Sequence, residues 1–417
     1  MDQRKNQPNV YIIGAGVSGL VAALVLEKHG ISPTILEATD EVGGRVKTAE
    51  KDGYLMDHGF QVLLDAYPKA KTYLDYDQLD LQPLLPGATI FSNGKSYSIG
   101  DPLRNAKFVW GTLFAPVGSL ADKLKILKLN KQLKTKSLDH IFDAPEVTTR
   151  QYLSDFGFSE KMIAQFFRPF FAGIFLEPDL ATSSRMFEFV FKMFGEGLAV
   201  IPKDGMQAIP NQLASQLKQT TIKFRHQVKN IQQQEITLDT DEKLTADFVI
   251  VTSGAEQLIP NYTSTLAWKS CDNLYFTTPT RTINEKIIGL NANENALINN
   301  VFYPTSIVPP TDGKQELLSV TIVREHDLTE TQLIEAVQKE LKEAFQIEHT
   351  TFIKRFEITK ALPQLSDLQY EREASESVIN EYVAIAGDHL LNGSLNAAMT
   401  SGEAAAMAAM AALNKRI

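Results

Sequence analysis

The sequence of 417 residues predicts an α/β fold that begins with a βαβ unit. The apolar run from Val10 to Ile13 is typical of a short buried strand. Residues 17–29 then carry apolar side chains at helical spacing and stop before Gly30, a common residue at a helix C-terminus. A second apolar run, Pro33 to Leu36, predicts the next strand and ends beside the acidic residue Glu37.

The turn between the first strand and the helix carries the motif Gly14-x-Gly16-x-x-Gly19. In such a motif the first glycine permits a tight turn, the second lets the backbone approach a pyrophosphate, and the third lets helix and strand pack closely. The helix N-terminus adds free N–H groups and a positive dipole end. Glu37 follows Gly16 by 21 residues, a distance at which a carboxylate can accept hydrogen bonds from a ribose. The combination predicts a dinucleotide site, and the alternative is a glycine turn that only eases packing.

The residues after Glu37 indicate which dinucleotide is bound. Five residues separate it from Gly43-Gly44-Arg45, an extension that a nicotinamide-binding domain has no reason to carry. This pattern resembles the flavoprotein amine oxidase superfamily, which includes protoporphyrinogen oxidases and phytoene-desaturase-like enzymes. The resemblance implies that both glycines pass close to the FAD diphosphate, with Arg45 near the phosphates and the flavin. We expect the FAD to be non-covalent, because Cys271, the one cysteine, lies outside every flavin motif.

Three later segments match the same family in order. Asp57 to Gln61 contains the D-x-G that would bring the backbone past the flavin ring, and Val228 would meet the adenine through its backbone. Gly387-Asp388 and Ser394-Leu395-Asn396 resemble the last FAD motif, in which a helix N-terminus points at the flavin N1/O2 edge. The full set of cofactor contacts that the resemblance implies is Gly14, Gly16, Val17, Ser18, Gly19, Glu37, Ala38, Gly43, Gly44, Arg45, Gly59, Phe60, Gln61, Val228, Gly387, Asp388, Ser394, Leu395 and Asn396.

The motif order predicts two domains. A discontinuous Rossmann-type FAD/NAD(P)-binding domain would comprise residues 1–70, 202–260 and 361–417, and a mixed α+β substrate-binding domain residues 71–201 and 261–360. We expect residues 71–201 to be mostly helical. Apolar alternation and runs predict the remaining elements: strands at 222–228, 246–251, 317–323, 352–358 and 382–386, a hairpin through 235–238, and helices at 329–345 and from 394.

Bulk properties exclude several classes of function. The formal net charge of −9 leaves no broad basic field for a nucleic acid. A single cysteine excludes an intramolecular disulfide and a cysteine-based metal site, and we predict no metal. The N-terminal residues carry no apolar signal segment, and no stretch is long and apolar enough to span a bilayer. We therefore expect a cytoplasmic protein.

Two segments bear on the substrate and on partners. Eleven of the 23 phenylalanines fall between Phe156 and Phe194, which is typical either of an apolar pocket or of an ordinary core. Arg168 and Arg185 lie among them and could orient a substrate or satisfy helix ends. Residues 105–138 join an aromatic run to a lysine-rich helix, which is typical either of peripheral contact with an anionic membrane or of a solvated helix.

The predicted activity is transfer of two electrons, as a hydride, from a small and apolar organic molecule to flavin N5. Gly393 to Asn396 offers no aromatic residue for an amine cage, which favours desaturase-like or protoporphyrinogen-oxidase-like chemistry over amine oxidation. A flavin amine oxidase and a non-catalytic carrier on the same fold are the alternatives. The candidates for a catalytic side chain are Gln61, His58 and Lys360.

Overall fold

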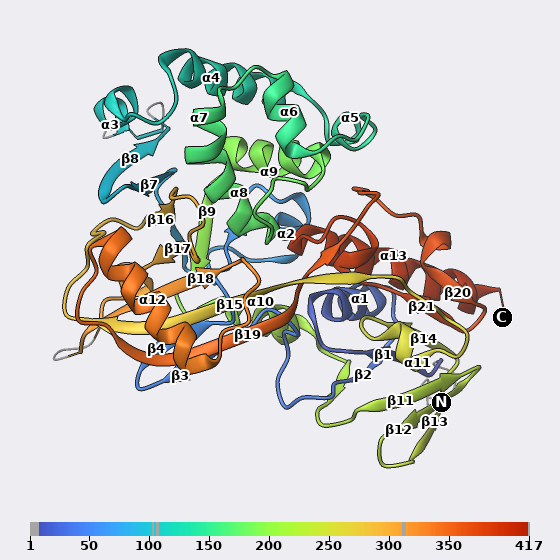
Figure 1. Ribbon diagram of the computed structural model, residues 1–417. Helices are drawn as coiled ribbons and strands as arrows, with labels where there is room; N and C mark the ends of the chain where they lie inside the picture. The colour runs from blue at the N-terminus through green and yellow to red at the C-terminus, as the bar shows by residue number, and fades with distance from the viewer. Residues whose placement is uncertain (1–7, 102–103, 106–107, 311–313, 416–417) are drawn as a thin grey trace.

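The predicted βαβ unit forms as β1 (Val10–Ile13), α1 (Val17–Lys28) and β2 (Thr34–Leu36) in the computed structural model (Figure 1). The structure describes residues 8–101, 104–105, 108–310 and 314–415. The unit belongs to a six-stranded sheet with the order β10-β2-β1-β14-β21-β20. All neighbouring strands are parallel except the edge pair β20–β21. The other strands are β10 (Thr221–Lys223), β14 (Phe248–Val251), β20 (Val378–Asn380) and β21 (Val383–Ile385).

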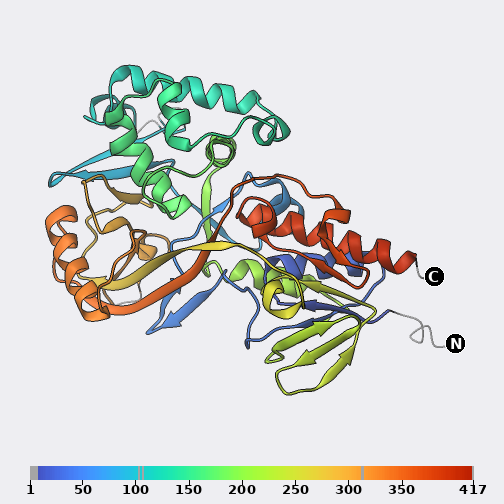
Figure 2. The ribbon, with the colours of Figure 1, turned by 45° about the vertical axis from the view of Figure 1, so that its right-hand side comes forward.

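This sheet is covered on both faces, which explains its continuously apolar strands. Helix α13 (Leu395–Asn414) packs against α1 on one face, and the alanine-rich sequence of α13 permits that close approach (Figures 1 and 2). A three-stranded antiparallel sheet covers the other face through a separate apolar cluster. Its strands are β11 (Val228–Gln232), β12 (Glu235–Leu238) and β13 (Lys243–Thr245), and the short helix α11 (Ala255–Leu258) packs against β11. Helix α10 (Ala208–Gln216) packs against α1.

A second, seven-stranded sheet has the order β19-β15-β18-β17-β16-β7-β8. It is antiparallel except for the pair β16–β7, and α12 (Glu330–Phe345) packs its apolar side on this sheet. The strands are β7 (Gly87–Ser92), β8 (Lys95–Gly100), β15 (Ala267–Thr278), β16 (Ile288–Asn291), β17 (Ile298–Phe302), β18 (Glu316–Ile322) and β19 (Thr351–Gln364).

A group of helices forms a further layer, seen at the top of Figures 1 and 2. Its members are α3 (Phe108–Phe114), α4 (Leu120–Thr135), α5 (Leu138–Phe142), α6 (Thr149–Asp155), α7 (Glu160–Met162), the π-helical turn η2 (Ile163–Phe167), α8 (Arg168–Phe175) and α9 (Ser184–Glu196). Residues 106–107 of the predicted 105–138 segment, and the side chains of Val109 and Trp110, lie outside the described part.

Short elements join these bodies. They are β3 (Thr48–Lys51) paired with β4 (Tyr54–Asp57), the small sheet of β5 (Leu63–Leu64), β9 (Ala199–Pro202) and β6 (Leu81–Pro83), helix α2 (Pro68–Tyr73), and the 3-10 turns η3 (Pro304–Ser306), η4 (Ala374–Ser377) and η5 (Asp388–Leu390).

Most of the regular structure in residues 71–201 is helical, as expected, although β6, β7 and β8 occupy much of 81–100. The turn between β7 and β8 places Asn93 (φ 50°) and Gly94 (φ 71°) in the left-handed region, and Asn-Gly is a standard hairpin signal. The expected single strand 222–228 is two strands, since the chain turns at Arg225 (φ 57°) and Val228 begins β11 in another sheet.

The predicted domain boundary before residue 361 falls inside a strand. β19 runs from Thr351 to Gln364 and pairs with β15 up to this last residue, which lies opposite Ala267. The long pair β15–β19 thus extends from the seven-stranded sheet toward the six-stranded sheet (Figure 1). The division into two domains with the predicted limits stays a prediction.

Asp57, the last residue of β4, forms hydrogen bonds with three separate segments of the chain. Its Oδ1 accepts hydrogen bonds from Thr48 Oγ1 at 2.5 Å and from the Met206 N–H at 3.0 Å. Its backbone oxygen accepts a bond from Tyr275 Oη of β15 at 2.8 Å. Burial raises the pKa of the Asp57 carboxyl to about 6, and these two donors offset only part of that rise.

This carboxyl predicts a pH-dependent stability. Because its folded pKa exceeds its unfolded value, its contribution is complete below about pH 4 and is lost as pH rises through about 6. Asp57→Asn, which keeps the acceptor, should flatten the dependence by on the order of 3 kcal/mol between those limits. Denaturant unfolding from pH 4 to 7 measures it, with the exposed Asp327→Asn as control. A variant with the wild-type pH profile would show that another group titrates.

Candidate cofactor and substrate site

A cavity of about 2360 Å³ runs from the first glycine-rich turn to the helices α4, α8 and α9. Most of the predicted cofactor contacts line it, although they come from segments far apart in the sequence. These lining residues are Gly14, Gly16, Val17, Ser18, Glu37, Gly43, Gly44, Arg45, Gly59, Phe60, Gln61, Gly387, Asp388, Ser394 and Leu395. The fold thus brings the separate motifs to one wall of one cavity.

The glycine turn is shaped to admit another molecule. Gly14 has φ +101°, and a Cβ there would lie 2.6 Å from Thr252 Oγ1, so a side chain is excluded on two grounds. Gly16 is the N-cap of α1 and forms a bridge with Gly43, so two strips of bare backbone lie side by side. No side chain caps the N–H groups of α1, and its first turn holds no acidic residue. This geometry fits a diphosphate.

Acidic and basic groups flank that turn. The buried Glu37 carboxylate accepts bonds from the Ala15 N–H at 2.7 Å and from the Thr39 N–H at 2.9 Å, which fixes it at the cavity wall. Arg45 bonds Asp388 and also donates to the Ala361 carbonyl at 3.1 Å. The arginine guanidinium lies 5.0 Å from the ring centroid of Trp268. These contacts hold Arg45 beside the cavity without consuming all of its donors.

Four predicted contacts do not line the cavity. Gly19 lies where a Cβ would meet the Gly14 carbonyl oxygen at 2.1 Å, so it serves the helix–strand packing. Ala38 is exposed, and Val228 is buried at the start of β11. The fully buried Asn396 accepts a bond from the Lys69 N–H at 3.0 Å. Side-chain contact of Asn396 with a cofactor in this cavity would therefore require rearrangement.

The three predicted catalytic candidates all line the cavity, but their side chains make different contacts. His58 stacks on Phe356 with ring centroids 4.2 Å apart, and burial lowers its pKa, as expected for a structural histidine. Gln61 uses its Nε2 to donate to the His58 carbonyl at 2.9 Å and to the Arg45 carbonyl at 3.1 Å, which orders the loop. Lys360 Nζ lies 6.0 Å from the Trp268 ring centroid.

The far half of the cavity is apolar. Its wall carries phenylalanines from η2, α8 and α9 together with other large apolar side chains: Phe166, Phe170, Phe171, Ile174, Phe175, Met186, Phe191, Phe194 and Leu362. Phe187 and Phe189 are instead fully buried in the core. Both interpretations of the phenylalanine cluster thus hold, each for a different subset. Arg185 donates to the Ala144 and Leu368 carbonyls and does not line the cavity.

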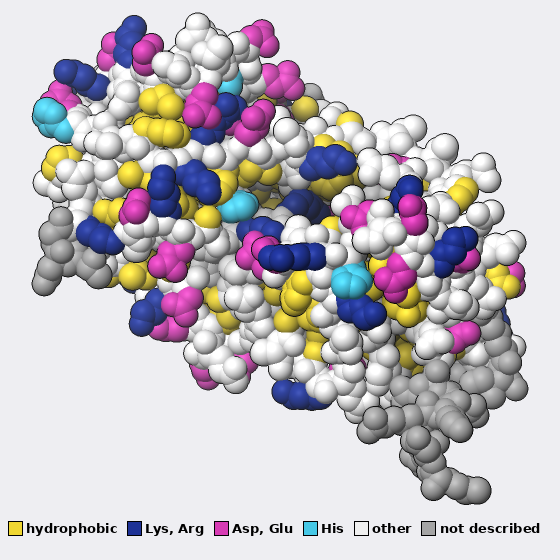
Figure 3. Space-filling model, turned by 90° about the horizontal axis from the view of Figure 1, so that it is seen from below, with side chains coloured by type: hydrophobic (Ala, Val, Ile, Leu, Met, Phe, Trp, Pro, Cys, Tyr) yellow, Lys and Arg dark blue, Asp and Glu magenta, His cyan; other side chains and the backbone are white. Residues whose placement is uncertain are grey.

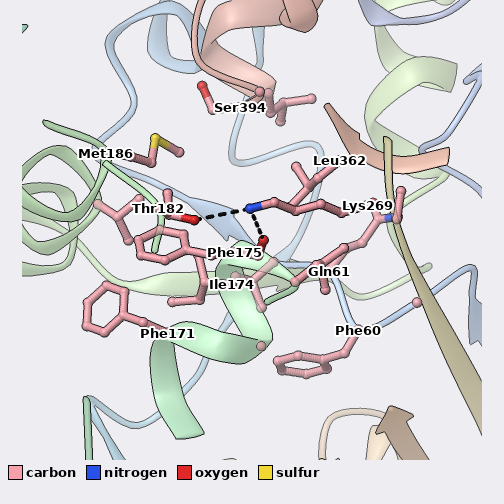
Figure 4. Close-up of a pocket in the computed structure, with 18 of the residues that line it drawn as sticks. Phe60, Gln61, Phe171, Ile174, Phe175, Thr182, Met186, Lys269, Leu362 and Ser394 are labelled. Carbon is pink, nitrogen blue, oxygen red and sulfur yellow. Dashed lines mark hydrogen bonds between the residues drawn. The ribbon is translucent and has the colours of Figure 1, made fainter. Parts of the chain in front are cut away.

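Lys269 places an ammonium group within this apolar part (Figure 4). It extends from β15, at a register shift of the β15–β19 pair, and its Nζ donates to the Phe175 carbonyl at 2.9 Å and to Thr182 Oγ1 at 3.1 Å. Phe175 is the last residue of α8, so its carbonyl is at the negative end of the helix dipole. Figure 4 shows Leu362 and Gln61 beside the lysine side chain.

Burial lowers the pKa of the Lys269 ammonium, and the nearby Glu177 opposes part of that effect. A lysine with a lowered pKa in a cavity is a standard sign of function. Lys269 stands in no sequence motif, and the β15–β19 pairing places it opposite Leu362, another lining residue of the cavity. Among the described residues, no group of three or more His, Cys, Asp or Glu is placed to hold a metal ion.

Comparison with known proteins identifies the family. The model of the family described as "Flavin containing amine oxidoreductase" matches residues 17–410. The chain belongs to the flavin-containing amine oxidoreductase family. This confirms the suspected resemblance, the Rossmann-type α/β fold, the flavin cofactor and the predicted class, an FAD-dependent oxidoreductase.

Proteins with sequences similar to this chain are named as different enzymes. The mitochondrial protoporphyrinogen oxidase of Nicotiana tabacum is 27% identical over 174 residues, which is 41% of this chain and 33% of that protein. The L-amino-acid oxidase of Trimeresurus stejnegeri is 27% identical over 279 residues, 59% of this chain and 51% of that protein. The matches thus span a third to a half of those relatives.

A solved structure of putrescine oxidase bound to putrescine aligns over 97% of this chain and 99% of its own, with TM-score 0.70 and 16% identity. At that identity the likeness establishes the fold alone. Within this fold, FAD supplies a two-electron acceptor. The residues that would hold it are those of the glycine turn, Glu37, the 43–45 segment and the 387–395 segment, which line one wall of the cavity.

Proposed function

We propose that this protein moves two electrons, as a hydride equivalent, from an apolar organic substrate to FAD. The observation that carries the proposal is one continuous cavity with the cofactor motifs at one end and an aromatic and aliphatic wall at the other. A hydride donor must be held against the flavin with water excluded, and apolar side chains supply both the contact area and the exclusion. A polyene or a porphyrinogen-like ring suits such a wall.

Amine oxidation is the second candidate, because the family name and two of the relatives above concern amines or amino acids. The last motif argues against it, since Gly393 to Leu395 brings glycine, serine and leucine to the cavity and no aromatic ring. A cationic amine would also have to enter the apolar part of the cavity, where an unpaired charge is costly to bury.

We propose Lys269, in place of His58 and Lys360, as the side chain that transfers a proton in the reaction. Its lowered pKa favours the neutral amine more than in water, so Nζ can take up or release a proton within the cavity. The Phe175 carbonyl and Thr182 hydroxyl hold Nζ in place for that task.

Phe170 tests the apolar wall. Phe170→Ala should weaken binding of an apolar reductant by about three- to tenfold, because it removes buried aromatic surface, and should leave FAD content unchanged. The control is Phe189→Leu, in the core outside the cavity. The dependence of anaerobic flavin bleaching on reductant concentration gives the affinity of each variant for the apolar reductant. Equal effects of the two variants, or none, would mean that this wall does not contact substrate.

We also propose that the protein is cytoplasmic and that residues 105–138 contact a membrane from one side. Exposed apolar side chains on α3 and α4 support the membrane contact. Among the described residues, no helix has the length and apolar character needed to cross a bilayer.

A further inference from the structure

Helices α3 and α4 expose an unusual set of large apolar side chains. Leu120 and Leu124 are each 60% exposed, Leu113 44% and Leu127 41%. We call these four the leucine face. Solvent exposure of neighbouring leucines is costly, and a cluster of this kind marks an interaction site. Phe114, which is 71% exposed, adjoins it at the end of α3.

The leucine face also belongs to the cavity. All four of its side chains are among the lining residues, as are Ile126 and Lys123 of the same helix. The apolar lining therefore continues from Phe166 and Phe170 outward to the molecular surface. A molecule that covers the leucine face lies directly at an opening of the cavity.

The charged residues of α4 are almost all basic. Asp122 is the one acidic residue of α4, and its oxygens accept bonds from Ser119 and Ser159, with its pKa lowered to about 2. Lys128, Lys131 and Lys134 are exposed on the same helix. The face seen from below the molecule instead carries basic and acidic side chains close together (Figure 3).

The lysines of α4 do not all contribute to this charge at the surface. Lys123 Nζ donates to the Leu113 and Ala115 carbonyls at 3.0 and 2.9 Å, and Lys125 donates to the Gly157 carbonyl. Lys136, which follows α4, pairs with Glu188. These three therefore hold α4 in place, and the attraction to an anionic surface would come mainly from Lys128, Lys131 and Lys134.

We propose that the leucine face docks on an anionic lipid bilayer and that the substrate passes from the lipid directly into the cavity. The proposal rests on the proposed function, since only an apolar substrate would partition into lipid. The occupant is a bilayer because an apolar patch flanked by lysines matches the boundary between acyl chains and anionic headgroups. Leucine insertion supplies most of the binding, and the exposed lysines add a salt-dependent part.

Vesicle binding tests the docking step. The FAD-loaded protein should co-sediment with vesicles of phosphatidylglycerol and phosphatidylcholine. Replacing Leu120, Leu124 and Leu127 together by serine should weaken binding by about tenfold or more, because three inserted side chains are lost. The matched control replaces three other exposed apolar residues, Val308, Val378 and Met407, by serine and should bind as the wild type does.

A charge pair completes this test. Lys131→Glu with Lys134→Glu should reduce binding to these vesicles at low salt by about tenfold. Lys339→Glu with Lys342→Glu, which has the same spacing on α12, should not. FAD content should remain that of the wild type in all variants. Failure of the wild type to bind, equal binding by the leucine variant, or a change in its oligomeric state without loss of vesicle binding would each overturn the proposal.

The loading route has its own readout. At low salt, an apolar reductant supplied in vesicles should bleach the flavin of the Lys131→Glu, Lys134→Glu variant about tenfold more slowly than that of the wild type. Both changed residues lie outside the cavity, so the same reductant in detergent micelles should bleach the two proteins equally. Equal rates from vesicles would overturn lipid-phase loading. If no apolar reductant bleaches the wild type even from micelles, the proposed function fails, while vesicle sedimentation still decides whether the leucine face docks.

Discussion

Lys269→Met is expected to slow flavin reduction by an apolar substrate by about 10²-fold or more, the usual contribution of a positioned proton-transfer group. Methionine keeps the length and fills the apolar surroundings but has no group that binds a proton. The wild-type rate should change with pH around a pKa below the ordinary lysine value, because burial lowers that pKa. This pH dependence should be absent from the variant. Stopped-flow reduction across alkaline pH measures both effects.

Two controls separate a role in the reaction from a role in packing. Lys360→Met removes another cavity lysine, whose Nζ lies over Trp268, and should change the rate by less than about threefold. Lys269→Arg retains a cation and should preserve FAD content but not the wild-type pH dependence, because arginine remains charged. A Lys269→Met protein with the wild-type rate and pH profile would remove this residue from the mechanism.

Glu37→Ala should weaken FAD binding by about ten- to a hundredfold. The substitution removes the carboxylate that lines the cavity and that would accept charge-assisted bonds from the ribose hydroxyls. It also leaves the Ala15 N–H without its present acceptor, which loosens the turn beside the glycine motif. Calorimetric titration of the FAD-free protein with FAD measures this affinity.

Glu37→Gln is the matched variant, since an amide oxygen can still accept a bond from the Ala15 N–H. We expect an intermediate affinity, because the charge is lost but the turn is retained. Glu41→Gln, an exposed acid in the same segment, should bind FAD as the wild type does. Equal FAD affinity in all three variants would show that Glu37 does not meet the cofactor.

The cofactor half of the site was predictable because local patterns determine it. The glycine motif and Glu37 each follow a strand whose apolar run is visible in the sequence, and the 43–45 segment is recognised by its spacing from Glu37. The spacing does not determine which side chains face the cavity. Asn396 follows the lining residues Ser394 and Leu395, yet the helical turn directs its side chain to the Lys69 N–H.

The substrate half depends on long-range pairing, which sequence patterns do not reveal. Lys269 meets Phe175 and Thr182 only because the β15 strand passes under the end of α8. The phenylalanines alternate between cavity and core within one helix: Phe187 is in the core, whereas Phe191 lines the cavity. The β7–β8 hairpin carried a readable Asn-Gly signal, but the expectation of a helical segment concealed it.

Anaerobic reduction of the bound flavin tests the central claim most directly. The purified protein should contain about one non-covalent FAD per chain, released on heat denaturation. It should be bleached by apolar polyenes or tetrapyrrole precursors in micelles, and small amines and amino acids should bleach it far more slowly. Rapid bleaching by amines with none by apolar compounds, or a protein that holds no FAD, would contradict the account.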